Sequence, residues 1–421
     1  LYADHFPYRQ FASARGVRRS PIHSYLKTEG ACFGEISGWE RANWFLPKAA
    51  KNAGKKAEYD YSWRRQNWFE YSAAEHMAVR QKVGMFDMSS FGKIKLIGRD
   101  AEAVLQRIAA NDVAVPVGKI VYTQFLNSEG HIEADVTITR LSADEFLIVT
   151  PAATIRRDLH WINGHIPDSS HAIAVDITVS ESVFVVMGPD ARSFLEPLIP
   201  QSLENKNFPF GTMQPIEIGH AIARAHRVSY VGELGWELYV SADMSAHVFE
   251  TIAARRKDFP LTMCGLHALD SCRIEKGFRH FGHDISNEDH VLEAGLGFVV
   301  KENKPSGKFG PMIGSDAVKA KLNDGLSQRL MQFRLKDPDP LLYHNEAIYR
   351  DGSVIGYLTS GNYGHHLGGA IGLGYVKCSV AGESAEAQLN AHYQIDVAGK
   401  LVDADVSLRP LYDPKALQVK R

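Results

Sequence analysis

The order of predicted helices and strands is the feature that most constrains the fold of this chain. Apolar periodicity predicts helices over 72–84, 100–110 and 263–277, and strands over 121–126, 134–141, 145–150 and 182–187. The first helix is predicted to begin with a capping box, Ser72 to Glu75. A parallel sheet wrapped by helices requires a regular strand–helix–strand repeat. Because this chain lacks that repeat, the sequence predicts an α+β fold rather than a doubly wound one.

Two parts of the chain differ from this mixed middle section. Residues 1–70 are rich in arginine and aromatic side chains but show no long helical or strand periodicity. We expect them to pack on a neighbouring domain, since they cannot bury a core of their own. Beyond about residue 325 the strands become short and glycine-punctuated, which is typical of a small β domain. The sequence thus divides into residues 1–70, 71–325 and 326–421.

Charge and composition exclude several classes of partner. The 47 Lys and Arg residues nearly balance the 49 Asp and Glu residues, so no broad positive field exists to hold nucleic acid or an acidic membrane. No apolar run approaches the roughly 18–20 residues that cross a bilayer. The four cysteines are scattered without metal-ligand spacing, so we expect free thiols in a reducing compartment and no metal site. Because the chain begins with Leu1 and shows no signal peptide, we expect a piece of a longer protein.

The segment from Asn127 to Thr139 offers the first candidate for chemistry. Turn residues precede a strand, and two-residue alternation places Asp135 on the polar face, opposite an apolar set that includes Val136. Aspartate is depleted in strands, so an acid here is a candidate catalytic group. A solvated strand face or a turn contact is the alternative, and the pattern alone favours it.

Two further segments combine acids with aromatic or basic residues. Between Tyr230 and Glu237, glycines on both sides of an acid predict a tight hairpin. An aromatic face beside a carboxylate suits a flat, amine-bearing ring, and an edge hairpin with exposed acids is the alternative. Between Asp270 and Gly277 the acids and Arg273 have the spacing of an ion-pair network along a helix. Phosphate-binding and dinucleotide-binding glycine motifs are missing, so a flavin or nicotinamide site within this chain is unsupported.

Taken together, the motifs resemble a known family. From about residue 70 to the end, six of them follow the order of the aminomethyltransferase (T-protein) family of the glycine cleavage system. They are N-x-x-G-x-x-x-x-D at Asn127–Asp135, Y-x-G-E-x-G-x-E at Tyr230–Glu237, D-S-x-R-x-E-K-G at Asp270–Gly277, G-H-D-I at Gly282–Ile285, E-A-G-L at Glu293–Leu296 and T-S-G-x-Y-G at Thr359–Gly364. Within residues 1–70, Gly16–Pro21, Gly30–Glu35 and Gly38–Phe45 resemble the stretch that joins the flavin half of dimethylglycine and sarcosine dehydrogenases to their folate half.

This resemblance implies a fold and a division of the chain. The fold is a three-lobed α+β folate-binding body with a C-terminal β-barrel. Residues 1–70 would be the tail of the oxidoreductase flavin half, 71–325 the folate-binding aminomethyltransferase domain, and 326–421 the barrel domain. The chain would therefore correspond to the C-terminal portion of a dimethylglycine/sarcosine dehydrogenase-like protein.

The resemblance also implies which residues form the site. They are Asp135 as the catalytic acid beside the pterin ring, Tyr122 and Tyr230 as aromatics of the pterin pocket, Glu237 as the acceptor for the ring's amino edge, and Arg273 as a contact for the folate tail carboxylates. Two positions depart from the family pattern. T-proteins carry a further Arg where this chain has Leu269, and usually a Pro where it has Val291.

The implied activity is capture of a reactive carbon. When an N-methyl amine such as dimethylglycine or sarcosine is oxidised, the resulting iminium would react with tetrahydrofolate to give 5,10-methylenetetrahydrofolate. FAD is expected only in an N-terminal half or a partner subunit. Alternatives are a standalone folate-dependent demethylase and a non-catalytic folate-binding accessory protein for iron–sulfur assembly, although the latter's cysteine motif is absent from Lys276–His280. Bacterial cytoplasm and mitochondrial matrix both remain open as compartments.

Overall fold

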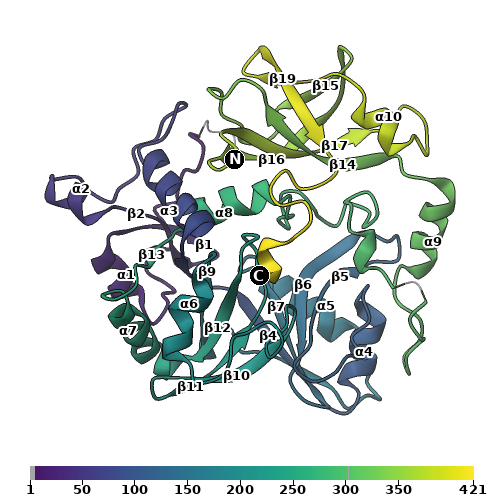
Figure 1. Cartoon of the computed structure of the whole chain (residues 1–421). Helices are drawn as coiled ribbons and strands as arrows, with labels where there is room; N and C mark the ends of the chain where they lie inside the picture. Colours follow the sequence, from purple (N-terminus) through teal and green to yellow (C-terminus); the bar gives the residue numbers. More distant parts are fainter. Residues whose placement is uncertain (1–4, 302) are drawn as a thin grey trace.

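Three lobes make up the computed structural model, which describes residues 5–301 and 303–421. In Figure 1 a six-stranded sheet lies at the lower left, a five-stranded sheet at the lower right and a closed barrel at the top. The α+β class with a C-terminal barrel, predicted from the sequence, is confirmed. Residues 1–4, at the start of the predicted linker, lie outside the described residues. The boundaries of the three predicted domains stay predictions.

The N-terminal segment packs onto the six-stranded sheet. Its elements are α1 His23–Glu29, β1 Ala31–Ile36, β2 Trp39–Phe45 and α2 Lys48–Asn52. Ile22, Leu26 and Phe45 lie in the same buried cluster as Phe184 and Trp236 of the sheet. The apolar side chains of this segment are too few to enclose a core, and they leave water by packing on a neighbour.

The six-stranded sheet has the order β10-β11-β12-β9-β3-β13. Its strands are β3 Gly84–Asp87, β9 Glu181–Met187, β10 Met213–Ile218, β11 Ala221–His226, β12 Gly235–Ser241 and β13 Thr262–Met263. The helices of this lobe are α3 Phe69–Gln81, α6 Ala191–Leu195, α7 Ser245–Arg255 and α8 Leu266–Glu275. On β12, Trp236 and Leu238 enter the core shared with α7, so two-residue alternation turns Glu237 and Tyr239 to the opposite face.

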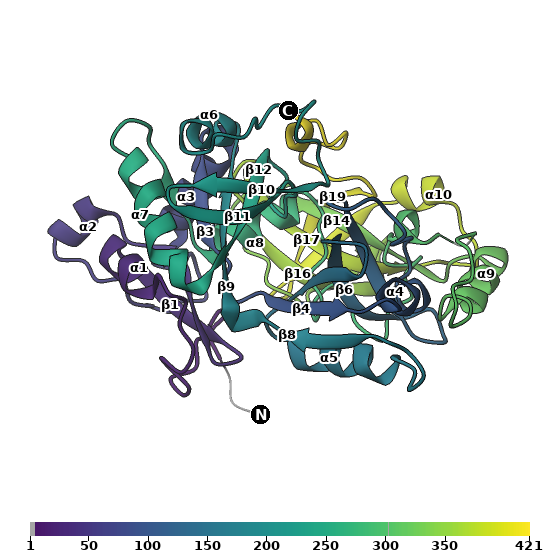
Figure 2. The same cartoon turned by 90° about the horizontal axis from the view of Figure 1, so that it is seen from below.

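The five-stranded sheet has the order β5-β6-β7-β4-β8. Its elements are β4 Gly92–Ile97, α4 Ala101–Ile108, β5 Ile120–Leu126, β6 Ile132–Arg140, β7 Glu145–Thr150, α5 Ile155–Gly164 and β8 Ile173–Asp176. Figure 2 shows α5 along the outer face of this sheet. Ala134, Val136 and Ile138 of β6 pack into the core on that side. Asp135 therefore faces the other way, toward the six-stranded sheet.

The inner faces of the two sheets share one buried cluster. Val149 on β7 and Val185 on β9 belong to it, together with Tyr239 on β12. Val149 lies directly opposite Thr137, which shares the face of Asp135 on β6. The tertiary fold thus turns the face of β6 that carries Asp135 and the face of β12 that carries Glu237 toward the same layer between the two sheets.

The C-terminal lobe is a closed barrel of order β14-β17-β16-β15-β18-β19. Its elements are α9 Ser315–Asp324, β14 Gln328–Leu335, β15 Ala347–Arg350, β16 Ser353–Gly364, β17 Gly369–Lys377, α10 Ala385–Leu389, β18 Tyr393–Val397 and β19 Lys400–Ser407. Short 3₁₀ turns complete the chain: η1 Thr178–Ser180, η2 Glu196–Leu198, η3 Ala242–Met244, η4 Gly297–Val299 and η5 Gln418–Lys420. No helix within the described residues combines the length and apolarity that crossing a bilayer needs.

Two local predictions are wrong. Helix α3 begins at Phe69 without a side-chain cap, and the carboxyl oxygens of Glu75 instead accept the backbone N–H groups of Phe45 and Gly265, each at 2.7 Å. Strands β11 and β12 are joined by a loop over 227–234 rather than by a tight hairpin. The exposed-acid alternative for that segment also fails, because Glu233 and Glu237 are 1% and 9% exposed. In both segments an acidic side chain accepts hydrogen bonds from groups distant in sequence, which a local pattern does not show.

Candidate active site

Asp135 is held in the layer between the two sheets. Gln124 lies directly opposite it on β5, and the Gln124 Nε2 donates to Asp135 Oδ1 at 2.7 Å. Burial raises the pKa of Asp135 to about 6, although Gln124, the Tyr122 phenol and the Arg279 guanidinium all act to lower it. The side chain nevertheless stays partly exposed. A carboxyl with such a pKa exchanges protons near neutral pH, as a general acid or base must.

Two phenol rings lie beside this carboxyl. Tyr122 is two residues from Gln124 on the same face of β5, and the Asp135 charge contributes to raising the Tyr122 pKa. Tyr230, in the loop before β12, stacks on Phe278 with ring centroids 5.9 Å apart. Burial, and to a smaller extent Asp135, raises the pKa of Tyr230 as well. The structure therefore brings Asp135, Tyr122 and Tyr230 into one region, as the sequence-based hypothesis requires.

Glu237 projects from β12 into the same inter-sheet layer. The Tyr239 hydroxyl donates to Glu237 Oε2 at 2.9 Å, and Oε1 accepts no hydrogen bond from the described residues. Burial raises the pKa of Glu237 to about 7. A largely buried carboxyl oxygen without a donor is suited to accept one from a ligand. Its contact with the amino edge of a pterin ring stays a prediction.

Arg273 has its guanidinium occupied by protein groups. It is 2% exposed, donates from Nε to Asp270 at 2.7 Å, and donates from Nη1 to Asp284 at 2.6 Å and to the Phe278 carbonyl at 3.1 Å. The predicted helical pair between Asp270 and Arg273 is thus present. These bonds fix the loop that follows α8, which carries the ring stacked on Tyr230. In this arrangement Arg273 positions the loop, and its contact with a folate tail stays a prediction.

Glu275, the second acid of the same motif, does not join the network along the helix. Its carboxylate accepts from Arg80 of α3 at 3.0 Å, and from the backbone N–H groups of His366 and Leu367 at 2.9 and 3.1 Å. Helix α8 therefore connects α3 on one side with the barrel on the other. Breaking such a buried charge pair by removing one partner typically costs about 3–5 kcal/mol.

Three of the sequence motifs meet at Asp284. This fully buried acid of G-H-D-I accepts from Arg273, from the Thr359 and Ser360 hydroxyls at 2.7 and 2.5 Å, and from the His280 N–H at 3.0 Å. The donors come from α8, from strand β16 and from the loop itself. A buried carboxylate is tolerated when charged and neutral donors surround it, as here. The motif residues thus join lobes that are far apart in sequence.

Arg279 and Gln124 are site residues that the sequence analysis did not assign. Arg279 donates from Nε to the Ala294 carbonyl at 3.0 Å and from Nη1 to the Gly277 carbonyl at 2.9 Å, and its charge lowers the pKa of Asp135. Gly295 of the E-A-G-L motif has a φ of +68°, and a Cβ there would lie 2.6 Å from Arg279 Nη2. The glycine therefore leaves room for the guanidinium. Gln124 could have been found from strand alternation, because it follows Tyr122 by two residues.

Comparisons with known proteins agree with this architecture. The GCVT N-terminal domain matches residues 22–304, and the glycine cleavage T-protein C-terminal barrel domain matches residues 328–413. Aminomethyltransferase of Halothermothrix orenii is 34% identical over 316 residues, which are 74% of this chain and 85% of that protein. The crystal structure of aminomethyltransferase T from Bartonella henselae superposes with a TM-score of 0.77 at 20% identity, covering 95% of this chain and 99% of that one. That structural match shows the fold.

Longer relatives match the whole chain. The 4-methylaminobutanoate oxidase (formaldehyde-forming) of Paenarthrobacter nicotinovorans is 41% identical over 422 residues, and human mitochondrial sarcosine dehydrogenase is 31% identical over 453 residues. Each match covers 100% of this chain but 49% of the relative, so the chain spans about half the length of these proteins. The fold and site define an aminomethyltransferase-type protein. The chain belongs to the glycine cleavage T-protein family, whose members are folate-dependent.

Proposed function

We propose that this chain captures the iminium carbon of an oxidised N-methyl amine on tetrahydrofolate, with 5,10-methylenetetrahydrofolate and the ammonium ion of the demethylated amine as products. Tetrahydrofolate would supply the two amine nitrogens that the carbon bridges in the product. The carbon–nitrogen bond of the iminium breaks as those bonds form, and the two nitrogens give up one proton each. The departing amine takes both protons, so charge and atoms balance. The names of the longer relatives support amines of the sarcosine, dimethylglycine and 4-methylaminobutanoate type as the source.

The observation that carries the proposal is the Asp135 carboxyl in one region with the phenols of Tyr122 and Tyr230, with a pKa raised to about 6. As a carboxylate, Asp135 accepts a proton from an attacking amine and stabilises cationic charge nearby. Tyr122 and Tyr230 would flank the flat ring, and the free oxygen of Glu237 would accept from its amino edge. Holding amine and electrophile together replaces a bimolecular encounter, an effect that reaches roughly 7–11 kcal/mol in favourable geometry.

A flavin enzyme would have to make the iminium. The longer relatives support a flavin-containing half of the same protein, or a partner subunit, as the source of the iminium. We include such a half or subunit in the proposal. Without folate capture, water hydrolyses the iminium to formaldehyde. A standalone demethylase would act without a flavin enzyme, and an accessory protein would bind folate without turnover.

The test uses a dimethylglycine-oxidising flavoenzyme that has no folate domain, mixed with this chain and tetrahydrofolate. We expect formaldehyde release to fall and methylenetetrahydrofolate to rise. Asp135→Asn should abolish capture while tetrahydrofolate affinity, measured by calorimetry, changes less than about threefold. Unchanged capture by this variant would remove Asp135 from the mechanism, and capture equal to a no-protein control would refute the proposed function.

A further inference from the structure

One charged group of the candidate site has no role in the proposed function. Arg279 lies in the loop after α8 and is half-buried. Its Nε donates to the Ala294 carbonyl and its Nη1 to the Gly277 carbonyl. Among the described residues, Nη2 donates to no acceptor and the guanidinium forms no ion pair with a carboxylate. A guanidinium presents a planar fork of donors that matches a carboxylate, so this end of the side chain is suited to an anionic group of a ligand.

The orientation of this guanidinium is set by the backbone of two sequence motifs. Gly277 ends the D-S-x-R-x-E-K-G motif, and Ala294 and Gly295 belong to E-A-G-L. Gly295 adopts a φ of +68°, and a Cβ on it would lie 2.6 Å from Arg279 Nη2. The two carbonyls and the missing Cβ therefore hold the guanidinium in one position. A donor that is fixed before the ligand arrives loses little conformational entropy on binding.

Arg279 lies near groups from all three lobes. The Tyr230 hydroxyl, from the loop before β12, donates to its backbone carbonyl at 2.8 Å. Burial raises the pKa of Asp135 on β6, of Tyr122 on β5 and of Tyr375 on β17, and the Arg279 charge acts against that rise at each of them. The guanidinium is therefore close enough to the candidate active site to interact with a charged group bound there.

Asp135 and Arg279 give the site two opposite charges that are not hydrogen-bonded to each other. Asp135 accepts from Gln124, and Arg279 donates to backbone carbonyls. A ligand with a cation and an anion close together can therefore place the cation beside Asp135 and the anion on Arg279. An oxidised N-methyl amino acid is such a ligand, because its iminium nitrogen and its carboxylate are a few bonds apart. The tail carboxylates of tetrahydrofolate match this pair of charges less well, since a benzoyl ring and an amide separate them from the reacting nitrogens.

We propose that Arg279 binds the carboxylate of the incoming iminium, so that this chain selects N-methyl amino acids over N-methyl amines that have no carboxylate. The identity of the ligand rests on the proposed function, whereas the position of the guanidinium is a feature of the structure itself. Arg279 is then a specificity-determining residue, and Asp135 remains the group that exchanges the proton.

The probe for this interaction is N,N-dimethylglycine, whose ammonium group stands in for the iminium nitrogen. Its partner in the comparison is 2-(dimethylamino)ethanol, which keeps the ammonium group but has a hydroxyl in place of the carboxylate. Both are titrated by calorimetry into the tetrahydrofolate complex at pH 8, where Asp135 is ionised because its pKa is about 6. Dimethylglycine should bind at least about tenfold more tightly, as a charge-assisted pair predicts. Equal affinities would overturn the proposal.

Two variants test whether Arg279 is the source of this preference. Arg279→Gln should weaken dimethylglycine about tenfold and change 2-(dimethylamino)ethanol less than about twofold. Gly295→Ala keeps the charge but displaces Nη2, so it should reduce the preference as well, and it decides the matter if Arg279→Gln does not fold. Full preference in folded Arg279→Gln, or equal weakening of both amines, would overturn the proposal. An effect on tetrahydrofolate affinity alone would also overturn it, because the guanidinium would then serve the folate tail.

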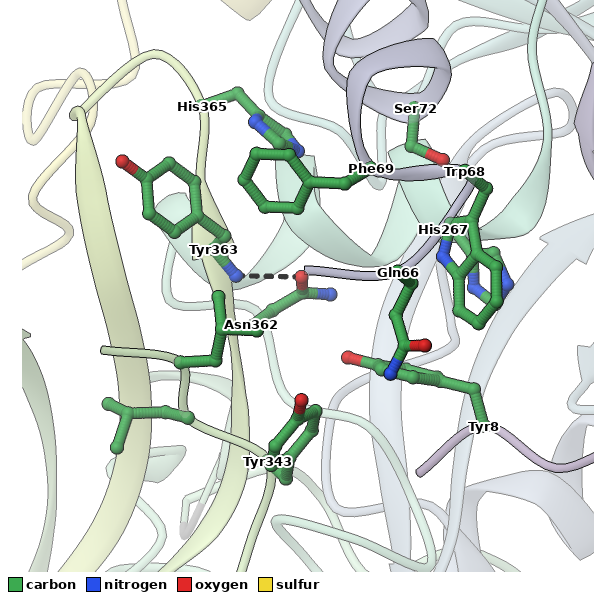
Figure 3. Close-up of a pocket in the computed structure, with 12 residues that line it drawn as sticks. Tyr8, Gln66, Trp68, Phe69, Ser72, His267, Tyr343, Asn362, Tyr363 and His365 are labelled. Atoms are coloured by element: carbon green, nitrogen blue, oxygen red, sulfur yellow. Dashed lines mark hydrogen bonds between the residues drawn. The ribbon is translucent and has the colours of Figure 1, made fainter. Parts of the chain in front are cut away.

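Arg65→Gln is the matched control. Arg65 is exposed, and its guanidinium lies 4.8 Å from the centroid of the Phe69 ring and 5.6 Å from that of Tyr363. Figure 3 shows these two rings in the wall of a cavity outside the candidate active site. With about 40 Å³, that cavity is too small for an amino acid. The control removes one positive charge away from the site and should leave both affinities unchanged, so an effect as large as that of Arg279→Gln would overturn the proposal.

A further variant distinguishes this inference from the proposed function. Asp135→Asn should lose capture and weaken both amines, since each carries a cation, but it should keep the preference for dimethylglycine. Loss of that preference in Asp135→Asn would refute the separate role of Arg279. A wild-type protein that prefers dimethylglycine but fails to capture the iminium would refute the proposed function alone, and one that captures the iminium without this preference would refute only the inference about Arg279.

Discussion

The hydrogen bond from Gln124 to Asp135 sets the pH range in which the proposed base works. We consider Gln124→Met, which keeps the approximate volume of the side chain but removes the donor 2.7 Å from the carboxylate. A hydrogen bond to a charged acceptor contributes about 1.5–3 kcal/mol, and about 1.4 kcal/mol corresponds to one pKa unit. The pKa of Asp135, about 6 in the native protein, should therefore rise to roughly 7–8.

The sign of the effect follows from which form the donor stabilises. Gln124 stabilises the carboxylate, so its loss favours the protonated acid and moves the midpoint upward. At pH 7 the ionised fraction should fall from roughly nine-tenths to between half and one-tenth. Capture that depends on the carboxylate should fall in proportion and should recover at higher pH.

Two measurements check this prediction. Carbon-13 NMR of the Asp135 carboxyl gives its pKa directly, and the pH profile of capture gives the kinetic midpoint. Thr137→Val is the matched control, because Thr137 shares the face of Asp135 on β6 but lies opposite Tyr122 rather than Gln124. A folded Gln124→Met protein whose midpoint stays near 6 would refute the reasoning, as would an equal shift in Thr137→Val.

Three further predictions concern the surroundings of the site. Asp284→Asn removes the buried carboxylate 2.6 Å from Arg273 and leaves Asp270 as its remaining carboxylate partner, so urea denaturation should give an unfolding free energy lower by about 1.5–3 kcal/mol; a change below about 0.5 kcal/mol would contradict this. Burial raises the pKa of Glu75 from 4.5 to about 8, so its contribution to stability is full below the unfolded pKa and is lost as pH rises toward 8. Glu75→Gln should flatten that part of the stability–pH curve, and an unaltered slope would count against it. Tyr230→Phe should keep tetrahydrofolate affinity within about threefold and Tyr230→Leu should lower it about tenfold or more, since ring stacking contributes roughly 1–3 kcal/mol; equal affinities in calorimetry would exclude Tyr230 from the pocket.

The sequence predicted regular elements well where periodicity and burial agree. Strand β7 has the bounds predicted for it, and β6 begins two residues before the prediction and ends one residue before it. The first helix was misplaced because Ser72 and Glu75 form a pattern that is identical to a capping box but lie inside the helix. A local pattern cannot reveal that a carboxylate will instead accept N–H groups from other segments.

The candidate site was likewise predicted in part from local sequence patterns. Alternation placed Asp135 on the polar face of its strand, and the ordered motifs identified the family. Helical spacing predicted the pair of Asp270 with Arg273, but the motifs did not reveal that Asp284 also pairs with Arg273, or that Gln124 donates a hydrogen bond to Asp135. These are contacts across strands and lobes.

Periodicity by itself predicted the α+β class and a small C-terminal β domain, and the order of the motifs gave the family resemblance, which implied that this domain is a barrel. Each of these depends on local preferences or on residue order along one chain. Only the tertiary structure decided which face of β12 meets which face of β6, and how far Asp135 is removed from water. Burial and nearby charges arise from residues distant in sequence, and they are what raise the pKa of this carboxyl to about 6. The chemistry available to Asp135 is thus a property of the packed lobes rather than of its strand.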